Sequence, residues 1–418
     1  MAQVSAQGHL VSNVHLLYSA CGIESARATN SATSVTMAAS TTGMGGEHTL
    51  EAAAMLALPS FLQQLLSPDV ETILFYGCGG GFDFVHSMLL YPILKAAGKK
   101  VVIVSNSFLN PNHYQRRPGW DVFTDPLVRM VDGSMSQKSS YEPEVHICSF
   151  LDAEFPDDAP HRVYACNARS DTGTVNWTIK RMTQMLQEIV DKHNIDAAVT
   201  IDGGSDGLMR GDEAGLADCI EDATSLAACA ALNVRAGIRL LISAGLGADR
   251  WNGISDASSL RAVAELTNAG GFRGTLSLEP TGAPASFYHR CLKHIYARQT
   301  SRLLVSYMIL NAVHGAYGVA QHPSIRDLAD TRRSWEGFTW PLSAMLWAFD
   351  ATVAARRSLL CEWLGEVDST RELKPYDSPF LQRKREALRA EGLKLLPEEM
   401  PPYESFARKG SFDKDGSK

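Results

Sequence analysis

The chain has 418 residues, of which 45% are apolar and 20% charged, and its formal net charge at pH 7 is −7. This composition predicts a large core and argues against nucleic acid as the main partner, because no long Lys/Arg run is present. No apolar stretch reaches the length of about 18 residues that a membrane-spanning helix needs, so we expect no membrane partner.

Residues 1–46 are rich in Ser, Ala, Thr and Gly, and we expect this N-terminal segment to be disordered. The segment has neither the basic start nor the apolar core of a secretory signal, although its scarcity of acids leaves an organelle transit peptide open. The eight cysteines are scattered without metal-binding spacing, which is typical of reduced, buried thiols. We therefore expect a cytoplasmic protein.

After a predicted helix at 47–66, short apolar runs alternate with helical stretches. The predicted strands lie near 71–76, 100–105, 145–150, 162–167, 197–202, 238–244 and 274–278. The predicted helices between several of them lie at 84–97, 174–193, 217–234 and 256–269. This alternation predicts an α/β fold of three layers, with a mainly parallel sheet and helices on both faces.

The remaining segments complete the predicted organisation. Residues 47–285 form the α/β domain, and the Pro- and Gly-rich stretch 107–144 is predicted to be an ordered insertion or lid. Residues 286–398 are predicted to be a mainly helical C-terminal part, with helix around 341–364, that could supply the interface of a homo-oligomer. The polar stretch 399–418 is expected to be a disordered tail.

Three of the apolar runs end in a glycine-rich turn that delivers an aspartate, at 77–83, 202–206 and 245–249. If the runs are parallel strands, the three turns leave the same edge of the sheet, where open α/β sheets bind ligands. Glycine lets the backbone approach a ligand closely. The predicted ligand-contacting glycines are Gly79, Gly80, Gly81, Gly203, Gly204, Gly245 and Gly247.

Acidic residues are dense at the second turn, where positions 202–222 hold seven acids and a single base, Arg210. Such carboxylates repel one another unless water or a cation separates them. Ligands that are all oxygen suit Mg²⁺ or Mn²⁺. The predicted metal ligands are Asp83, Asp202, Asp206 and Asp249.

Two of these acids also have a structural alternative. Asp83 could cap the helix at 84–97, and Asp249 could cap the element that follows it. The acids Asp218, Glu221 and Asp222 are interpreted mainly as the acidic start of a helix, where they complement the helix dipole.

Two other motifs fit the turns less well. The first turn lacks the third glycine of a dinucleotide fingerprint and the Gly-Lys-Ser/Thr of a P-loop. Ser205 stands in a Gly-x-Ser-x-Gly pattern, but a poor helix start follows it, so we favour a metal-facing or turn-forming hydroxyl over a nucleophile. Cys78 is interpreted as a small filler of the first turn, with a reactive thiolate as the alternative.

Basic side chains on the loops could orient an anionic substrate, although each could equally be a surface charge. These candidates are His113, Arg116, Arg117, Arg210 and Arg250. His314 is either a general base or, more simply, a core or capping histidine.

The segments 75–83, 202–213 and 244–249 resemble signatures of the domain-of-unknown-function 1152 family, and the resemblance covers roughly residues 70–320. It implies an α/β protein similar to the D-glutamate cyclase group, with a divalent metal held by acidic residues at the sheet edge. Carried over by position, the implied ligands are the four predicted above. Many members have a shorter Asp-x-Gly-Gly-Asp turn, which Ser205 lengthens here.

We therefore expect a divalent-metal-dependent enzyme that acts on a small carboxylate or phosphate metabolite, with cyclase, lyase or phosphatase chemistry. The predicted catalytic residues are Asp206 at the metal, Arg210 orienting the anion, and Ser205 as a hydroxyl at the turn. The alternative is a non-catalytic, oligomeric module that binds metal or nucleotide.

Overall fold

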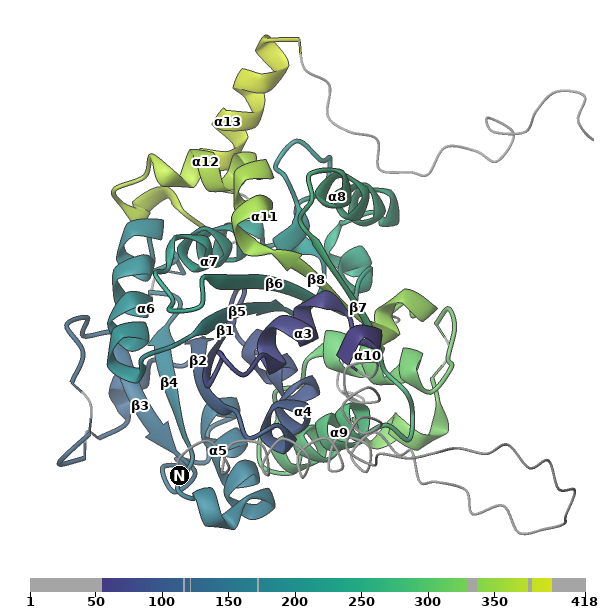
Figure 1. The fold of residues 1–418 in the computed structure, drawn as a ribbon. Helices are drawn as coiled ribbons and strands as arrows, with labels where there is room; N and C mark the ends of the chain where they lie inside the picture. The colour runs from purple at the N-terminus through teal and green to yellow at the C-terminus, as the bar shows by residue number, and fades with distance from the viewer. Residues whose placement is uncertain are drawn as a thin grey trace, which may run out of the picture.

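The computed structural model describes residues 55–115, 117–120, 122–170, 173–319, 321–328, 337–374 and 378–392. Their strands form one eight-stranded sheet in the order β3-β4-β2-β1-β5-β6-β8-β7 (Figure 1). The strands are β1 Thr72–Gly77, β2 Lys100–Ser107, β3 Val128–Asp132, β4 Arg162–Asn167, β5 Ala197–Asp202, β6 Ile238–Ala244, β7 Phe272–Ser277 and β8 Met345–Asp350. Strands β4, β2, β1, β5 and β6 run parallel, so the predicted mainly parallel sheet is confirmed. Strands β3 and β8 are antiparallel to their neighbours.

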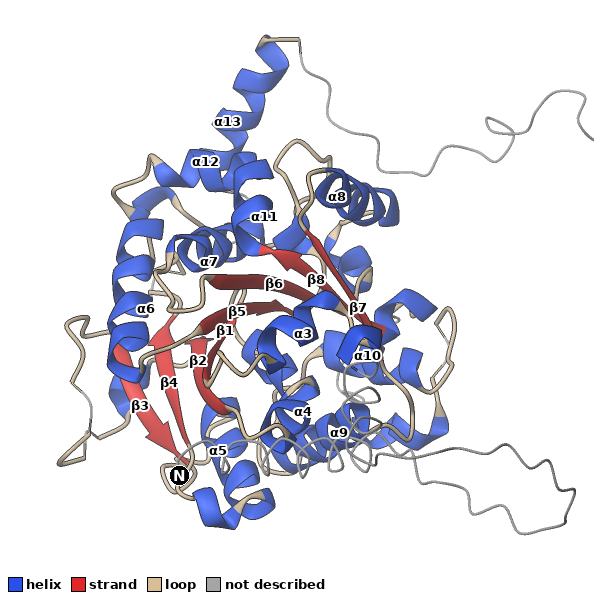
Figure 2. Ribbon diagram, in the orientation of Figure 1, coloured by secondary structure: helices blue, strands red, loops and turns tan. Residues whose placement is uncertain are grey.

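Helices cover both faces of the sheet (Figure 2). On one face pack α3 Ser60–Leu66, α4 Tyr91–Ala96, α5 Pro143–Glu154, α9 Ala283–Tyr296 and α10 Leu304–Val313. On the other pack α6 Ile179–His193, α7 Cys219–Ala231, α8 Asp256–Asn268, α11 Ala351–Arg357, α12 Leu359–Gly365 and α13 Pro379–Ala390. Short 3₁₀ helices occupy the turns: η1 Asp83–Leu89, η2 Pro111–His113, η3 Pro156–Asp158, η4 Asp206–Leu208, η5 Ala248–Asn252, η6 Pro323–Leu328, η7 Pro341–Ala344 and η8 Thr370–Glu372. The predicted three-layer fold is thus confirmed.

The central strand β1 shows why the sheet is a middle layer. Ile73 and Phe75 enter the core beneath α3, α4 and α9, whereas Leu74 and Tyr76 enter the core beneath α6 and α7. All four are at most 1% exposed. Because successive strand residues point to opposite faces, a strand that is apolar at every position must be covered on both sides. Each such side chain contributes about 1.5–3 kcal/mol through burial.

One predicted strand is wrong, because residues 145–150 lie in helix α5. A short apolar run fits a buried strand or a buried helix equally well. Pro143 at the first helical position favours the helix start. The helix then packs between the sheet and α9, so both of its sides are apolar.

The C-terminal part differs from its prediction as well. Residues 345–350, expected to be helical, form strand β8, which lies between β6 and β7 in the same sheet. Asp350 ends the strand and caps α11 by accepting the backbone N–H groups of Thr352 and Val353. The C-terminal part is therefore mainly helical, but it also contributes one strand, β8, to the main sheet.

Smaller differences concern element ends. The stretch 107–144, predicted to be an insertion or lid, contributes η2 and the edge strand β3. The helix expected at 47–66 is interrupted at Pro59, since proline disfavours helix at the residue before it. The helix expected at 84–97 is divided into η1 and α4. The disorder predicted for 1–46 and 399–418 falls outside the described residues. Within the described residues no helix is both long and apolar enough to cross a bilayer.

Candidate metal centre

The carboxyl ends of β1 and β5 meet where the strand order reverses. Strand β1 pairs with β2 on one side and with β5 on the other, and β6 lies beside β5, all in parallel. The three glycine-rich turns therefore leave the same edge of the sheet, as predicted. Ligands of open α/β sheets bind in the crevice at such a reversal of strand order.

Three carboxylates converge at this edge. Asp202 is the last residue of β5, Asp206 is the first residue of η4, and Asp222 lies in the first turn of α7. Each offers an oxygen within 4.8 Å of oxygens of the other two. Asp202 and Asp222 are buried, whereas Asp206 is partly exposed. The Gly207 N–H donates to Asp202 Oδ2 at 3.1 Å, which orients that carboxylate.

Asp83 and Asp249 flank these three. Asp83 Oδ2 and Asp222 Oδ1 lie 2.6 and 2.8 Å from the point that a Cβ at Gly79 would occupy, and Gly79 has a φ of +121°. Only glycine fits both this conformation and this space. Asp249 Oδ2 accepts the Ser205 N–H at 2.5 Å, which holds the turn after β5.

Burial raises the pKa of each of these five carboxyls, and in Asp83, Asp202, Asp222 and Asp249 repulsion from the others raises it further. The pKa of Asp206 is raised to about 6. Those of Asp83, Asp202, Asp222 and Asp249 are raised well above the usual range, with the charge of Asp206 as the largest electrostatic contribution after burial. The five groups cannot all ionise at neutral pH unless a positive charge joins them.

The neighbouring acids are neutralised by the protein itself. Arg169, which follows β4, donates to both oxygens of Glu221 at 2.9 and 2.8 Å and to Asp218 Oδ2 at 2.7 Å. Its guanidinium also lies over the ring of Phe108, 4.2 Å from the centroid. Among the described residues, none of the five central carboxylates has a comparable ion pair.

Asp83 and Asp249 do not cap the elements that they were expected to cap. The residue at the cap position of η1 is Phe82, and that of η5 is Gly247, so Asp83 and Asp249 are inside these elements. Asp218 precedes α7 without making a side-chain cap.

Ser205 and Cys78 are both buried. The Ser205 side chain is fully buried and accepts a hydrogen bond from Ser259 Oγ at 3.0 Å. A three-residue 3₁₀ helix follows it instead of the helix that a nucleophile elbow requires. Burial, reinforced by Asp222 and Asp202, raises the pKa of the Cys78 thiol, so a thiolate is disfavoured.

Three of the basic candidates form ion pairs with acids other than the five central carboxylates. Arg210 pairs with Asp212, Arg250 with Asp256, and Arg117 with Asp132. His113 lies in η2, and Arg116 is outside the described residues. His314 stacks on His322, with ring centroids 5.0 Å apart, and burial lowers its pKa.

The predicted glycines have different surroundings. A Cβ at Gly80 or Gly81 would meet the Phe108 ring, and one at Gly203 or Gly204 would meet Asp83 and His86 or Asp249. Gly203 and Gly204 therefore lie against the central carboxylates, whereas Gly80 and Gly81 lie against Phe108. Gly245 and Gly247 instead lie against Ile309 and Trp340, so their missing side chains serve close packing.

Sequence reasoning missed four residues of this edge: His86, Asn106, Arg169 and Asp222. Asp222 was interpreted as a helix-start acid, because the only sequence feature that pointed to a site there was the density of acids at 202–222. The other three belong to no motif, and only the packing of β2, β4 and η1 brings them here.

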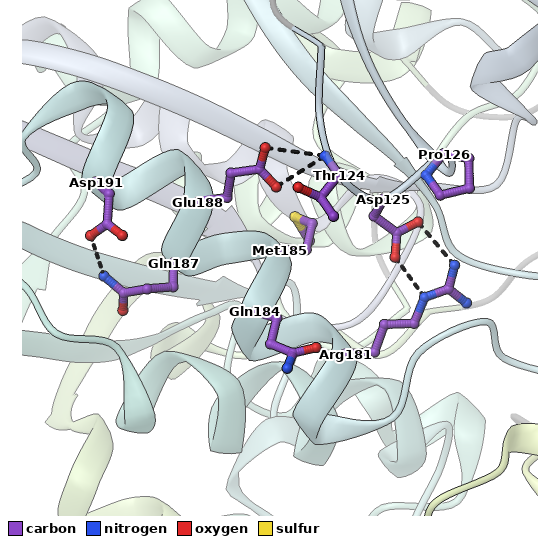
Figure 3. A pocket seen from close by; sticks show the side chains of 9 residues that line it. All are labelled: Thr124, Asp125, Pro126, Arg181, Gln184, Met185, Gln187, Glu188 and Asp191. Carbon is purple, nitrogen blue, oxygen red and sulfur yellow. Dashed lines mark hydrogen bonds and ion pairs between the residues drawn. The ribbon is translucent and has the colours of Figure 1, made fainter.

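A depression lies elsewhere, between the 122–127 segment and α6 (Figure 3). Its volume is about 680 Å³. Its charged side chains already have partners: Asp125 with Arg181, Glu188 with the Thr124 N–H, and Asp191 with Gln187. We therefore interpret it as a paired polar surface and not as the site.

The fold and this edge together define an α/β protein with an acidic centre at the reversal of strand order. The model of the family described as "Protein of unknown function (DUF1152)" matches residues 170–374, and this part of the chain belongs to that family. This range includes β5, β6, α7 and four of the five central carboxylates. No curated protein and no solved structure matches the chain.

Proposed function

We propose that Asp202, Asp206 and Asp222 hold a divalent cation, Mg²⁺ or Mn²⁺, and that the protein is a metal-dependent enzyme acting on a small anionic metabolite. The observation that carries the proposal is the convergence of their three oxygens within 4.8 Å at the reversal of strand order. Hard cations such as these take carboxylate ligands.

The contrast with the neighbouring acids supports a cation. Arg169 neutralises Glu221 and Asp218, whereas the central carboxylates keep their mutual repulsion. Burying like charges without compensation costs several kcal/mol, a cost that a bound cation would offset. The residues fit the ion, because every member of the group is a carboxylate.

Partial exposure of Asp83 and Asp206 supports access from solvent. A bound cation would polarise a substrate oxygen or lower the pKa of a bound water. The reaction classes that need these parts are cyclisation or elimination on an acidic compound and hydrolysis of a phosphate ester.

The test is a turnover screen of metal-stripped protein with small carboxylates and phosphate esters, with and without Mg²⁺ or Mn²⁺. Turnover should require the cation and fall by about 100-fold or more in Asp206→Asn. Asp212→Asn is the matched control, because Asp212 lies in the same loop but pairs with Arg210. Binding of the cation without turnover of any compound would favour the non-catalytic module.

A further inference from the structure

Phe108 is an exposed aromatic residue at the edge of the sheet where the carboxylates converge. It follows strand β2 directly, and it is 45% exposed although the strand is buried from Ile103 to Ser107. A single exposed apolar side chain is ordinary on a protein surface. What distinguishes Phe108 is that several contacts hold its ring in place beside the acidic centre.

The first glycine-rich turn receives the end of the ring. A Cβ at Gly80 would lie 2.5 Å from Phe108 Cε1, and a Cβ at Gly81 would lie 2.6 Å from Cε2, so any side chain at either position would displace the ring. Asn106 joins the end of β2 to the same turn. Its Nδ2 donates to the Gly79 carbonyl at 2.8 Å, and its own carbonyl accepts the Gly81 N–H at 2.8 Å.

Two further side chains contact the ring. The Arg169 guanidinium lies over it, 4.2 Å from the ring centroid, and Arg169 is itself held by Glu221 and Asp218. The ring of Tyr141 stacks on Phe108 with centroids 6.1 Å apart and 28° between the planes. A side chain that is already ordered loses little conformational entropy when a ligand contacts it. Phe108 therefore offers a preorganised aromatic surface.

The same turn also borders the central carboxylates. The Cβ position of Gly79 lies 2.6 Å from Asp83 Oδ2 and 2.8 Å from Asp222 Oδ1, and the next residue, Gly80, touches Phe108. Consecutive Cα atoms are only about 3.8 Å apart. The aromatic ring and the carboxylates thus lie against neighbouring residues of one turn, within reach of a single small molecule.

We propose that Phe108 determines substrate specificity by contacting the part of the substrate that is not anionic, and that this part is a planar, aromatic group. The inference rests on the proposed function, in which a cation at Asp202, Asp206 and Asp222 binds the anionic group. Aromatic rings pair in offset-stacked or edge-to-face arrangements and gain from them beyond the area that they bury. The substrate class is therefore a small carboxylate or phosphate that carries an aromatic ring close to its anionic group.

Isothermal titration of the Mn²⁺-loaded full chain with matched pairs of probes tests this role. Phenyl phosphate and methyl phosphate share an anionic group and differ in the ring, as do phenylacetate and acetate. In the parent, the ring-bearing member of at least one pair should bind about tenfold tighter or more. Phe108→Ala should reduce that ratio to about twofold or less, whereas Phe108→Tyr should retain it. Val122→Ala, which truncates an exposed apolar side chain in another segment, should keep the ratio of the parent.

The outcomes separate this role from the proposed function. Melting temperature and Mn²⁺ affinity, measured for every variant, show whether the fold and the metal centre are intact. If the parent binds Mn²⁺ but does not prefer the ring-bearing probes, or if Phe108→Ala keeps the preference, the role of Phe108 is overturned and the metal centre remains. Equal weakening of both members of a pair in Phe108→Ala would show a structural role only. No Mn²⁺ binding by the parent would overturn the proposed function, and this inference with it.

Discussion

Glu221 and Asp222 are consecutive residues of α7, yet their carboxylates have opposite surroundings. Both oxygens of Glu221 accept hydrogen bonds from Arg169, whereas Asp222 Oδ1 has no partner among the residues that the structure describes, and its carboxylate lies with those of Asp202 and Asp206. The helix thus separates Glu221, which the protein pairs with an arginine, from Asp222 and the acids around it, which have no such pair among the described residues. The second group is the one we assign to a cation.

The first prediction is that Asp202→Asn stabilises the metal-free protein at pH 8. The raised carboxyl pKa values mean that the folded state holds more protons than the unfolded state above about pH 4, so the free energy of unfolding falls as pH rises. Removing one charge should raise that free energy by about 1–3 kcal/mol in urea unfolding.

The gain should shrink towards pH 4, where the parent carboxyls are protonated, and Asp212→Asn should show no comparable gain. A variant that is less stable than the parent at pH 8 would contradict the mutual repulsion. The same variant should lose the rise in melting temperature that Mg²⁺ or Mn²⁺ causes in the parent.

The second prediction concerns pH and cation affinity. A cation displaces the protons that the raised pKa values retain, so affinity should rise between pH 5 and 7, through the pKa of about 6 of Asp206. The increase should be about tenfold per pH unit for each proton released. Calorimetry in two buffers of different ionisation enthalpy measures that release, and a pH-independent affinity with no proton release would refute the assignment.

The third prediction is that Arg169→Met destabilises the fold by about 3 kcal/mol, because it leaves Glu221 as an unpaired buried charge. Arg169→Lys should recover little, since an ammonium cannot replace the two-pronged contact. The double variant Arg169→Met/Glu221→Gln should regain much of the loss. Equal stability of the single and double variants in urea unfolding would show that the pair is not coupled.

The fourth prediction concerns Asp196, which joins the starts of β1 and β5. Its Oδ2 accepts the N–H groups of Glu71 and Thr72, both at 2.8 Å, and its Oδ1 pairs with Arg235. Burial opposes the charge, but these contacts prevail and lower the pKa of Asp196. Asp196→Ala should cost about 2–3 kcal/mol at neutral pH.

A lowered pKa stabilises the fold above the unfolded value of about 3.9, and that contribution is lost as the pH falls below it. Parent and Asp196→Ala should therefore converge in acid. Arg235→Gln is the control, expected to cost less than about 1 kcal/mol because this arginine is largely exposed. A constant difference between parent and Asp196→Ala down to pH 3 would be inconsistent with this account.

The fifth prediction is that Ser205 does not react with a fluorophosphonate probe, since its side chain is fully buried in the turn. Labelling that disappears in Ser205→Ala would restore the serine-nucleophile hypothesis. If the parent is not labelled and Ser205→Ala still binds metal, the Ser205 hydroxyl serves only the structure of the turn.

The sheet was predictable wherever an apolar run was bounded by turn residues. Strands β1, β5 and β6 combine such runs with the glycine-rich turns, and all three lie where expected. Strand β8 and helix α5 were not predictable, because short apolar runs fit both structures. What decides between them is packing: β8 pairs with β6 and β7, strands that lie at least about 70 residues earlier in the chain.

The site was predictable only in part, for a related reason. Asp202 and Asp206 belong to a local turn, so their meeting follows from short-range geometry. Asp222 reaches them only because α7 packs against η4 and the edge of β5. Asn106 and His86 belong to no motif, and only three-dimensional packing brings them to this edge.

The most direct test of the central claim is isothermal titration of metal-stripped protein with Mn²⁺, for the parent, Asp222→Asn and Asp212→Asn. We predict that the parent and Asp212→Asn bind the ion equally well and that Asp222→Asn loses about 100-fold or more in affinity. Equal binding by all three proteins, or no binding by the parent, would contradict the assignment of Asp202, Asp206 and Asp222 as a metal centre.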